Sequence, residues 1–180
     1  NMKLFKILIL NILFSFPYLI SAQNLNTLTF DGIDNYVNID AVSNKITGNV
    51  ISAEIRFKTN NSGSDASNQL LSFHKSDNSN ILRIGTAANG GIFAMTGSGV
   101  AVQGSGYNDG QWHLLSIIAF ENGTVFAYVD GVSSFEFDLN PFDWSQAAKC
   151  SIGQEYDASN TSDHFTGSIS ELRLWDKQLT

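Results

Sequence analysis

The chain has 180 residues, a net charge of −7 and a sequence pI of about 4.7. So acidic a protein repels phosphate groups, which excludes a nucleic-acid partner. Hydrophobic residues make up 43% of the chain, enough to bury a core. Cys150 is the one cysteine, so no disulfide can form within the chain, and we expect it to be a small buried side chain in a strand.

Residues 1–22 have the pattern of a cleaved secretion signal. A short basic segment containing Lys3 comes first, an apolar run follows, and Ala22 offers a small residue for cleavage. The apolar run is roughly 14 residues, short of the ~20 that cross a bilayer. We therefore expect a secreted or cell-surface protein with no membrane span after cleavage and one mature domain over residues 23–180. Asn1, which precedes the first Met, is interpreted as an artefact.

Apolar and polar residues alternate in several segments of the mature chain. The clearest are residues 27–30, 52–58 and 125–130, and residues 169–175 follow the pattern less regularly. A period of two with one apolar face is typical of strands that are buried on one side. Residues 69–82 come nearest to an amphipathic helix, but a polar run interrupts them.

Turn signals separate these segments at intervals of roughly ten residues. They include Asp109-Gly110, Asn122-Gly123 and Asp130-Gly131, which tolerate the positive φ that tight hairpins need. Short strands at this spacing predict an all-β fold, a two-sheet antiparallel β-sandwich of the jelly-roll type with about twelve strands.

Four stretches, in this order along the chain, carry a resemblance to a known superfamily. They are residues 28–37 (LTFDGIDNYV), 109–113 (DGQWH), 128–131 (YVDG) and 165–175 (FTGSISELRLW). The ordered set resembles the laminin-G-like, concanavalin-A-like jelly-roll superfamily and spans nearly the whole mature chain. The resemblance implies an extracellular binding module.

Two further segments are similar to the pentraxins within that superfamily. Residues 151–157 (SIGQEYD) are similar to the pentraxin segment that supplies calcium ligands, and residues 73–78 (FHKSDN) to an earlier loop that adds an Asp-Asn pair. The pentraxin cysteine pair is missing, since Glu54 and Leu115 stand where those cysteines align. The stretch 157–167 is also shorter, so the later pentraxin ligands are not matched.

The resemblance implies a calcium site. The two matched loops supply Asp77, Asn78, Glu155 and Asp157. With Asp163 added, they would give four carboxylates and one amide oxygen, and the Tyr156 carbonyl would add another oxygen. Calcium binds six to eight oxygens, and two acidic loops far apart in the sequence can supply them if the fold brings both to one rim. Without an ion, four carboxylates meeting there would repel each other and raise their pKa values. The alternative is that the loops stay apart and their charges are solvated.

Other residues invite functional interpretations that the pattern does not favour. Glu136 and Asp138 are a carboxylate pair, but one family of jelly-roll glucanases has a third carboxylate where this chain has Pro141. Retaining glycosidases need two carboxyl groups in different protonation states, so we expect this pair to face solvent. Trp112 is a candidate sugar platform, although a place capping the core is favoured. We expect His113 to form structural hydrogen bonds.

The sequence therefore predicts a non-catalytic module that recognises a carbohydrate or glycoprotein surface with the help of calcium. Protein oxygens would hold the ion, ligand oxygens would fill its open positions, and Tyr107 or Tyr156 would stack on a sugar ring. Two alternatives stay open: a protein–protein adhesion module with a structural calcium ion, and a glycoside hydrolase of the jelly-roll type. The sequence indicates neither the ligand nor the oligomeric state.

Overall fold

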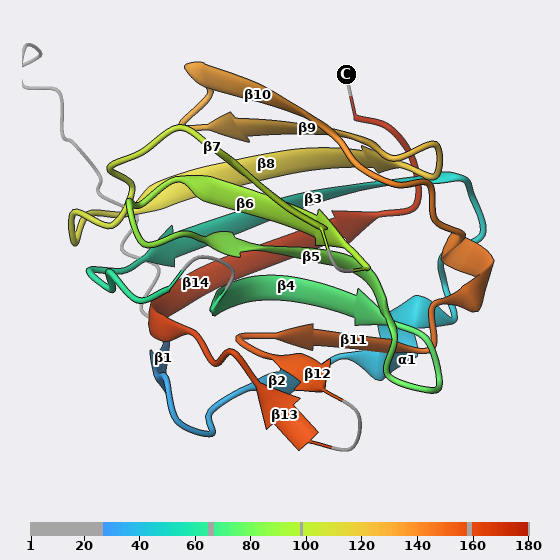
Figure 1. Cartoon of the computed structure of the whole chain (residues 1–180), viewed down its shortest axis with the longest axis horizontal. Coiled ribbons are helices and arrows are strands. Elements are labelled where there is room, and N and C mark those ends of the chain that lie inside the picture. Colours follow the sequence, from blue (N-terminus) through green and yellow to red (C-terminus); the bar gives the residue numbers. More distant parts are fainter. Residues whose placement is uncertain (1–26, 65–66, 98, 158–159, 180) are drawn as a thin grey trace, which may run out of the picture.

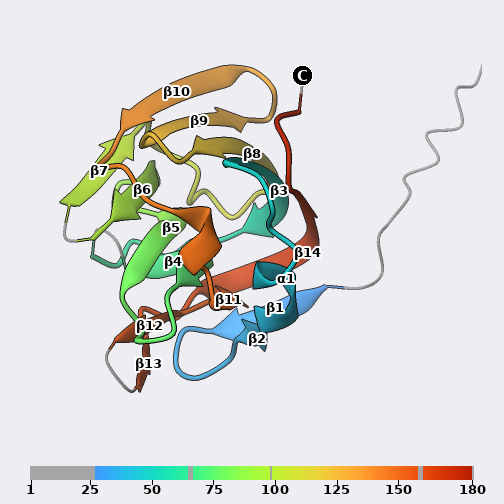
Figure 2. The same cartoon turned by 90° about the vertical axis from the view of Figure 1, so that its right-hand side faces the viewer.

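The computed structural model describes residues 27–64, 67–97, 99–157 and 160–179. These residues form two six-stranded antiparallel sheets that pack face to face, with a separate two-stranded hairpin at one side (Figure 1, Figure 2). The predicted all-β sandwich is confirmed, and the two sheets match the roughly twelve strands expected of it. The predicted signal segment, residues 1–22, lies outside the described residues.

The first sheet, sheet A, has the strand order β1–β14–β3–β8–β9–β10. In that order its strands are Leu28–Asp31, Thr166–Trp175, Val50–Lys58, His113–Phe120, Thr124–Val129 and Ser133–Asp138. The second, sheet B, has the order β2–β11–β4–β5–β6–β7. Its strands are Val37–Asn38, Lys149–Ile152, Asn68–His74, Asn80–Thr86, Ile92–Thr96 and Gly99–Gln103.

Alternation in the sequence places one face of each sheet A strand in the core. On β3, the side chains of Ile55 and Phe57 are at most 1% exposed, whereas Glu54 and Arg56 lie on the opposite, half-buried face. Strand β9 follows the same rule. Burying whole aliphatic and aromatic side chains contributes about 1.5–3 kcal/mol each, which makes this core the main source of stability.

Residues 69–82, the segment nearest to a helix in its pattern, are the β4–β5 hairpin. The polar run is the turn, which the Lys75 amide closes by donating to the Ser79 carbonyl over 2.9 Å. Cys150, on β11, is fully buried in the core as expected, and burial raises the pKa of its thiol well above the ordinary value.

Strand β4 is buried on both faces, unlike the strands of sheet A. One face, with Leu71 and Phe73, belongs to the core between the sheets. The other is covered by the hairpin of β12 (Glu155–Asp157) and β13 (Asn160–Ser162), of which β12 packs on β4. Sheet B therefore has a second covered surface on its outer face.

The connection from β10 to β11 carries the chain from sheet A to sheet B at one end of the sandwich (Figure 2). It contains the short helix η1 (Trp144–Gln146), and Trp144 packs its ring 5.1 Å from that of Phe73 in the core. The other helix of the described ranges, α1, is Asp40–Ser43, and none of the helices there has the length and hydropathy needed to cross a membrane.

His113 joins two of the sequence motifs. Its Nδ1 lies 2.8 Å from a carboxylate oxygen of Asp130, and its Nε2 lies 3.2 Å from one of Asp109. Burial lowers the pKa of His113, but the hydrogen bonds to Asp130 and Asp109 outweigh it and raise the pKa above the ordinary value. The structural role expected for His113 is confirmed.

Candidate functional site

The β4–β5 turn holds the first two predicted calcium ligands. Asp77 accepts hydrogen bonds from the amide and hydroxyl of Ser79 at 3.0 and 2.6 Å, and the hydroxyl bond lowers the pKa of Asp77. Asn78 has a φ of 69°. Its Oδ1 accepts a hydrogen bond from the Lys149 ammonium. The Asp77 side chain therefore bonds within the turn, and the Asn78 side chain bonds to Lys149.

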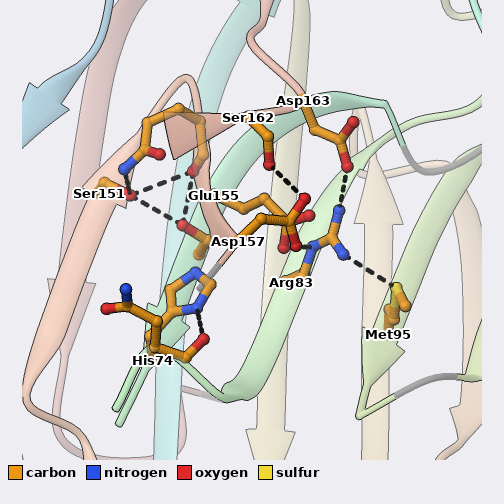
Figure 3. Close-up of polar contacts among 11 residues, drawn as sticks. His74, Arg83, Met95, Ser151, Glu155, Asp157, Ser162 and Asp163 are labelled. Atoms are coloured by element: carbon orange, nitrogen blue, oxygen red, sulfur yellow. Dashed lines mark hydrogen bonds and ion pairs between the residues drawn. The ribbon is translucent and has the colours of Figure 1, made fainter. Parts of the chain in front are cut away.

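Glu155 and Asp163 lie at the two ends of the β12–β13 hairpin and share one partner, Arg83 of β5 (Figure 3). Arg83 Nε is 2.7 Å from Glu155 Oε2, and Arg83 Nη2 is 2.6 Å from Asp163 Oδ2. The side chains of Arg83 and Glu155 are 5% and 2% exposed. Burial raises the pKa of Glu155, and the Arg83 guanidinium opposes that shift.

Tyr156 and Asp157 lie between those two carboxylates in the sequence. The Asp157 carboxylate is exposed and accepts a hydrogen bond from Ser162 Oγ over 2.9 Å. The Tyr156 ring lies edge-on to His74, with centroids 5.4 Å apart, and the Lys149 Nζ is 4.8 Å from its centre. Burial raises the pKa of the Tyr156 hydroxyl. Lys149 thus occupies one face of the ring predicted to stack on sugar.

The structure brings Glu155 and Asp163 together but not as a calcium site. Within the described ranges, no group of three or more Asp, Glu, His or Cys side chains is placed to hold one metal ion. A calcium ion needs six to eight oxygens at 2.3–2.6 Å. The predicted donors instead face protein cations and hydroxyl groups, so in this arrangement they do not fit the ion. Calcium binding stays a prediction of the sequence.

A layer of buried polar side chains, the polar layer, fills the space between sheet B and the β12–β13 hairpin. We define it as Ser72, His74, Arg83, Ser151, Gln154 and Glu155. Ser72 Oγ donates to the Gln154 carbonyl over 2.6 Å, and Gln154 Nε2 donates to Ser151 Oγ over 2.7 Å. Burial lowers the pKa of His74 to about 4, so this histidine is neutral at physiological pH. Because buried polar groups are costly without partners, this network fixes the hairpin on the sheet.

A hollow at the end of the sandwich, the rim hollow, is the best candidate for a ligand site. It lies between the β4–β5 turn, the end of β6 and the β10–β11 connection, and its volume is about 420 Å³. Its chemically distinctive lining residues are Lys75, Asn80, Asn140, Phe142, Asp143 and Gln146. The hollow therefore combines an ammonium, a carboxylate, three amides and an aromatic ring.

The β10–β11 wall of the rim hollow is held by hydrogen bonds. The Phe142 amide donates to the Glu121 carbonyl, and the Trp144 amide to the Glu121 carboxylate, each over 2.9 Å. The Asp143 carboxylate accepts a hydrogen bond from the Ser145 amide of η1. Hydrogen bonding to Ser145 lowers the pKa of Asp143 and keeps the carboxylate ionised. A wall that is already ordered loses little entropy when a ligand binds.

Two other predicted residues, Tyr107 and Trp112, lie away from the rim hollow. Tyr107 is partly buried against the core, with its ring 5.4 Å from that of His113, so packing occupies the ring expected to stack on sugar. Trp112 is half-buried but does not cap the core, because it lies beside Arg56 and Lys58, 5.2 and 5.4 Å from its ring centre.

Glu136 and Asp138 are exposed on β10, at the edge of sheet A. The expectation that this pair faces solvent is confirmed. Phe137, between them, points into the core with 1% exposure. The pair therefore lies on an open surface and not in the buried, apolar surroundings in which one carboxyl group serves as a general acid.

Sequence reasoning missed Arg83 and the rim hollow. The signal for Arg83 was a lone basic residue inside the apolar run Ile81–Ile84, a position that requires a buried partner. The rim hollow has no such signal, because its walls come from segments that only the fold brings together.

Comparison with known proteins identifies the family. The chain belongs to the concanavalin A-like lectin/glucanases superfamily, whose family model matches residues 31–180. The membership inferred from the four motif stretches is therefore confirmed. No curated protein sequence matches the chain.

Solved structures share the fold at low sequence identity. The CBM40 module of a Ruminococcus gnavus IT-sialidase, bound to α2,3-sialyllactose, has a TM-score of 0.67 and 13% identity, over 86% of this chain and 94% of that one. A native heptameric SAP-like pentraxin from Limulus polyphemus has a TM-score of 0.64 and 17% identity, over 86% and 77%. The NanB sialidase from Streptococcus pneumoniae has a TM-score of 0.66 and 17% identity, and this chain covers 26% of its length.

Proposed function

We propose that this chain is a non-catalytic carbohydrate-binding module and that the rim hollow is its sugar site. The observation that carries the proposal is the mixed chemistry of a hollow of about 420 Å³ in a lectin-superfamily fold. Small-molecule sites usually measure ~300–1,000 Å³ and combine apolar walls with a few convergent polar groups.

The lining suits a sugar ring in particular. Sugar hydroxyls both donate and accept hydrogen bonds, which matches the amides of Asn80 and Asn140, the ammonium of Lys75 and the carboxylate of Asp143. The C–H face of a sugar is apolar and can pack on the Phe142 ring. Lys75 also suits the carboxylate of an acidic sugar, and the CBM40 module of similar fold binds sialyllactose.

The same lining argues against hydrolysis. Asp143 is the one carboxylate among the described residues that line the hollow, whereas most glycosidases need two flanking the scissile bond. Export from the cell, which residues 1–22 predict, agrees with a glycan ligand. Calcium assistance and the adhesion alternative are not part of this proposal.

A glycan array that contains neutral oligosaccharides and α2,3-sialyllactose tests the function, followed by calorimetry with the best ligand. We expect Asn140→Ala and Lys75→Ala each to weaken binding about tenfold, because each removes a hydrogen-bonding group worth roughly 1.4 kcal/mol. Lys45→Ala, which removes an exposed lysine outside the rim hollow, is the matched control and should leave the affinity unchanged.

Two results would contradict the proposal. If no glycan on the array binds, the chain is not a module that binds the kinds of carbohydrate on the array. If a glycan binds but Trp112→Ala abolishes binding while the two rim variants do not, the site lies on the outer face of sheet A. We also expect no release of reducing sugar from any glycan that binds.

A further inference from the structure

We infer that the Arg83 guanidinium is a built-in cation that holds the β12–β13 hairpin on sheet B in the place where the family resemblance puts a calcium ion. The hairpin then folds without a metal, and we expect removal of the arginine to leave the Glu155 and Asp163 carboxylates free to bind a cation. The inference does not depend on the sugar site, which lies at the rim of the sandwich.

The position of Arg83 is the first argument. Glu155 begins β12 and Asp163 follows β13, so the two ion pairs of 2.7 and 2.6 Å clamp both ends of the hairpin to β5 (Figure 3). The third nitrogen, Nη1, lies 3.4 Å from Met95 Sδ on β6. A planar guanidinium can bind two carboxylates in this way because its donors form a rigid fork.

Burial and charge are the second argument. Glu155 is 2% exposed, so ionisation of its carboxyl group requires a cation within contact distance, and Asp163 is 33% exposed beside it. A metal ion or an arginine can meet that requirement, and both cannot occupy the same oxygens. Arg83 meets it in this structure.

The remaining predicted ligands supply the third argument. Asp77 bonds to Ser79 and Asp157 to Ser162. Asn78 Oδ1 accepts from Lys149, a second cation on the same side of sheet B. Every side chain of the predicted calcium set therefore has a protein partner, and two of those partners are positively charged.

The backbone fixes the same arrangement. Asp163 has a φ of 50°, a conformation uncommon for a residue other than glycine, and its carbonyl accepts a hydrogen bond from the Gln69 amide over 3.2 Å. The Phe165 amide donates to the Gly153 carbonyl over 2.9 Å. The end of the hairpin is thus directed toward Arg83 by main-chain bonds that need no ion.

Thermal melts in calcium, magnesium or EGTA, with terbium luminescence excited through the tyrosine and tryptophan side chains, test the inference on the whole chain. Wild-type protein should melt within about 1 °C in the three buffers, because an ion that does not bind the native state cannot stabilise it. It should also give no terbium signal. Arg83→Met removes the charge and keeps a side chain of similar length, so Glu155 and Asp163 are left without their cation.

We expect Arg83→Met to melt lower than wild type in EGTA, to gain at least about 5 °C from millimolar calcium, and to bind terbium. The matched control is Arg173→Met. Arg173 also pairs with two carboxylates, those of Glu54 and Glu171, but it is 53% exposed. Its loss should change the melting temperature little and confer no response to calcium, since exposed ion pairs contribute little.

Each outcome of these measurements either supports or overturns the inference. A wild-type melting temperature that rises with calcium, together with terbium binding, would overturn it and restore the calcium site. An Arg83→Met variant that is folded but indifferent to calcium, or that stays unfolded with calcium present, would also overturn it, because Arg83 would then be a packing group. An Arg83→Met variant that folds only with calcium supports it.

Discussion

Replacing Trp144 by alanine should lower the free energy of unfolding by about 3–5 kcal/mol, the usual cost of removing a buried aromatic side chain. Trp144 is 1% exposed, and its ring meets those of Phe73 and Phe142 edge-on, with centroids 5.1 and 4.8 Å apart. It anchors the β10–β11 connection to sheet B, so the cavity left by alanine also loosens one wall of the rim hollow. Urea unfolding followed by far-UV circular dichroism measures the change.

Trp144→Phe keeps an aromatic ring at this position and reduces the side-chain volume, so it separates the contribution of ring contact from that of volume. Within the described residues the indole N–H has no hydrogen-bond partner, so phenylalanine loses volume but no hydrogen bond and should cost roughly 1–2 kcal/mol. Trp112→Ala is the matched control, because Trp112 lies outside the core and is half-buried. A cost for Trp144→Ala no larger than that for Trp112→Ala would show that the connection does not depend on this anchor.

Acid should destabilise the wild-type protein relative to a His74→Gln variant. His74 is fully buried in the polar layer, and burial lowers its pKa to about 4 from an ordinary 6.5. As the pH falls below 6.5, the unfolded chain protonates this histidine while the folded chain does not, so stability is lost between pH 6.5 and 4. Between pH 7 and pH 4.5, the difference in free energy of unfolding between wild type and His74→Gln should shift by on the order of 2–3 kcal/mol in favour of the variant.

The groups around His74 support the sign of this effect. Arg83 and Lys149 disfavour its charged form, and Asp157 favours it. His113→Gln is the control of opposite sign. The folded-state pKa of His113 is raised, so its contribution is present at low pH and lost as the pH rises, and removing it should steepen the loss in acid. Parallel pH–stability curves for wild type and His74→Gln would contradict the prediction.

The strands could be predicted because a side-chain period of two appears directly in the sequence. On β3, the residues predicted to point inward, such as Ile55 and Phe57, are the ones buried. The pattern was less clear for residues 69–82, because β4 is covered on both faces and polar residues such as Ser72 and His74 are also buried there. A strand with two covered faces has no simple alternation to detect.

The sites were harder to predict, because they depend on contacts between distant segments. The sequence marked Glu155 and Asp163 as notable acidic residues, but their partner Arg83 is on another strand and about eighty residues away. Tyr107 looked available for stacking because a sequence does not show which side of a loop faces the core. The family resemblance supplied the fold correctly, yet it could not show whether an ion or an arginine neutralises the hairpin.

Strand β14 comes after the other strands of sheet A in the chain, yet it lies between β1 and β3 in that sheet (Figure 1). Ile169 pairs with Leu28 on one side and with Phe57 on the other. During synthesis, β1 therefore has no neighbour in sheet A until β14 has left the ribosome. Pairing across so long a stretch of chain is slow, because the entropy of closing the loop is lost before the contacts form. Sheet A is thus completed only after translation of β14, although β8, β9 and β10 are neighbours in both the chain and the sheet and, with β3, need not wait for it.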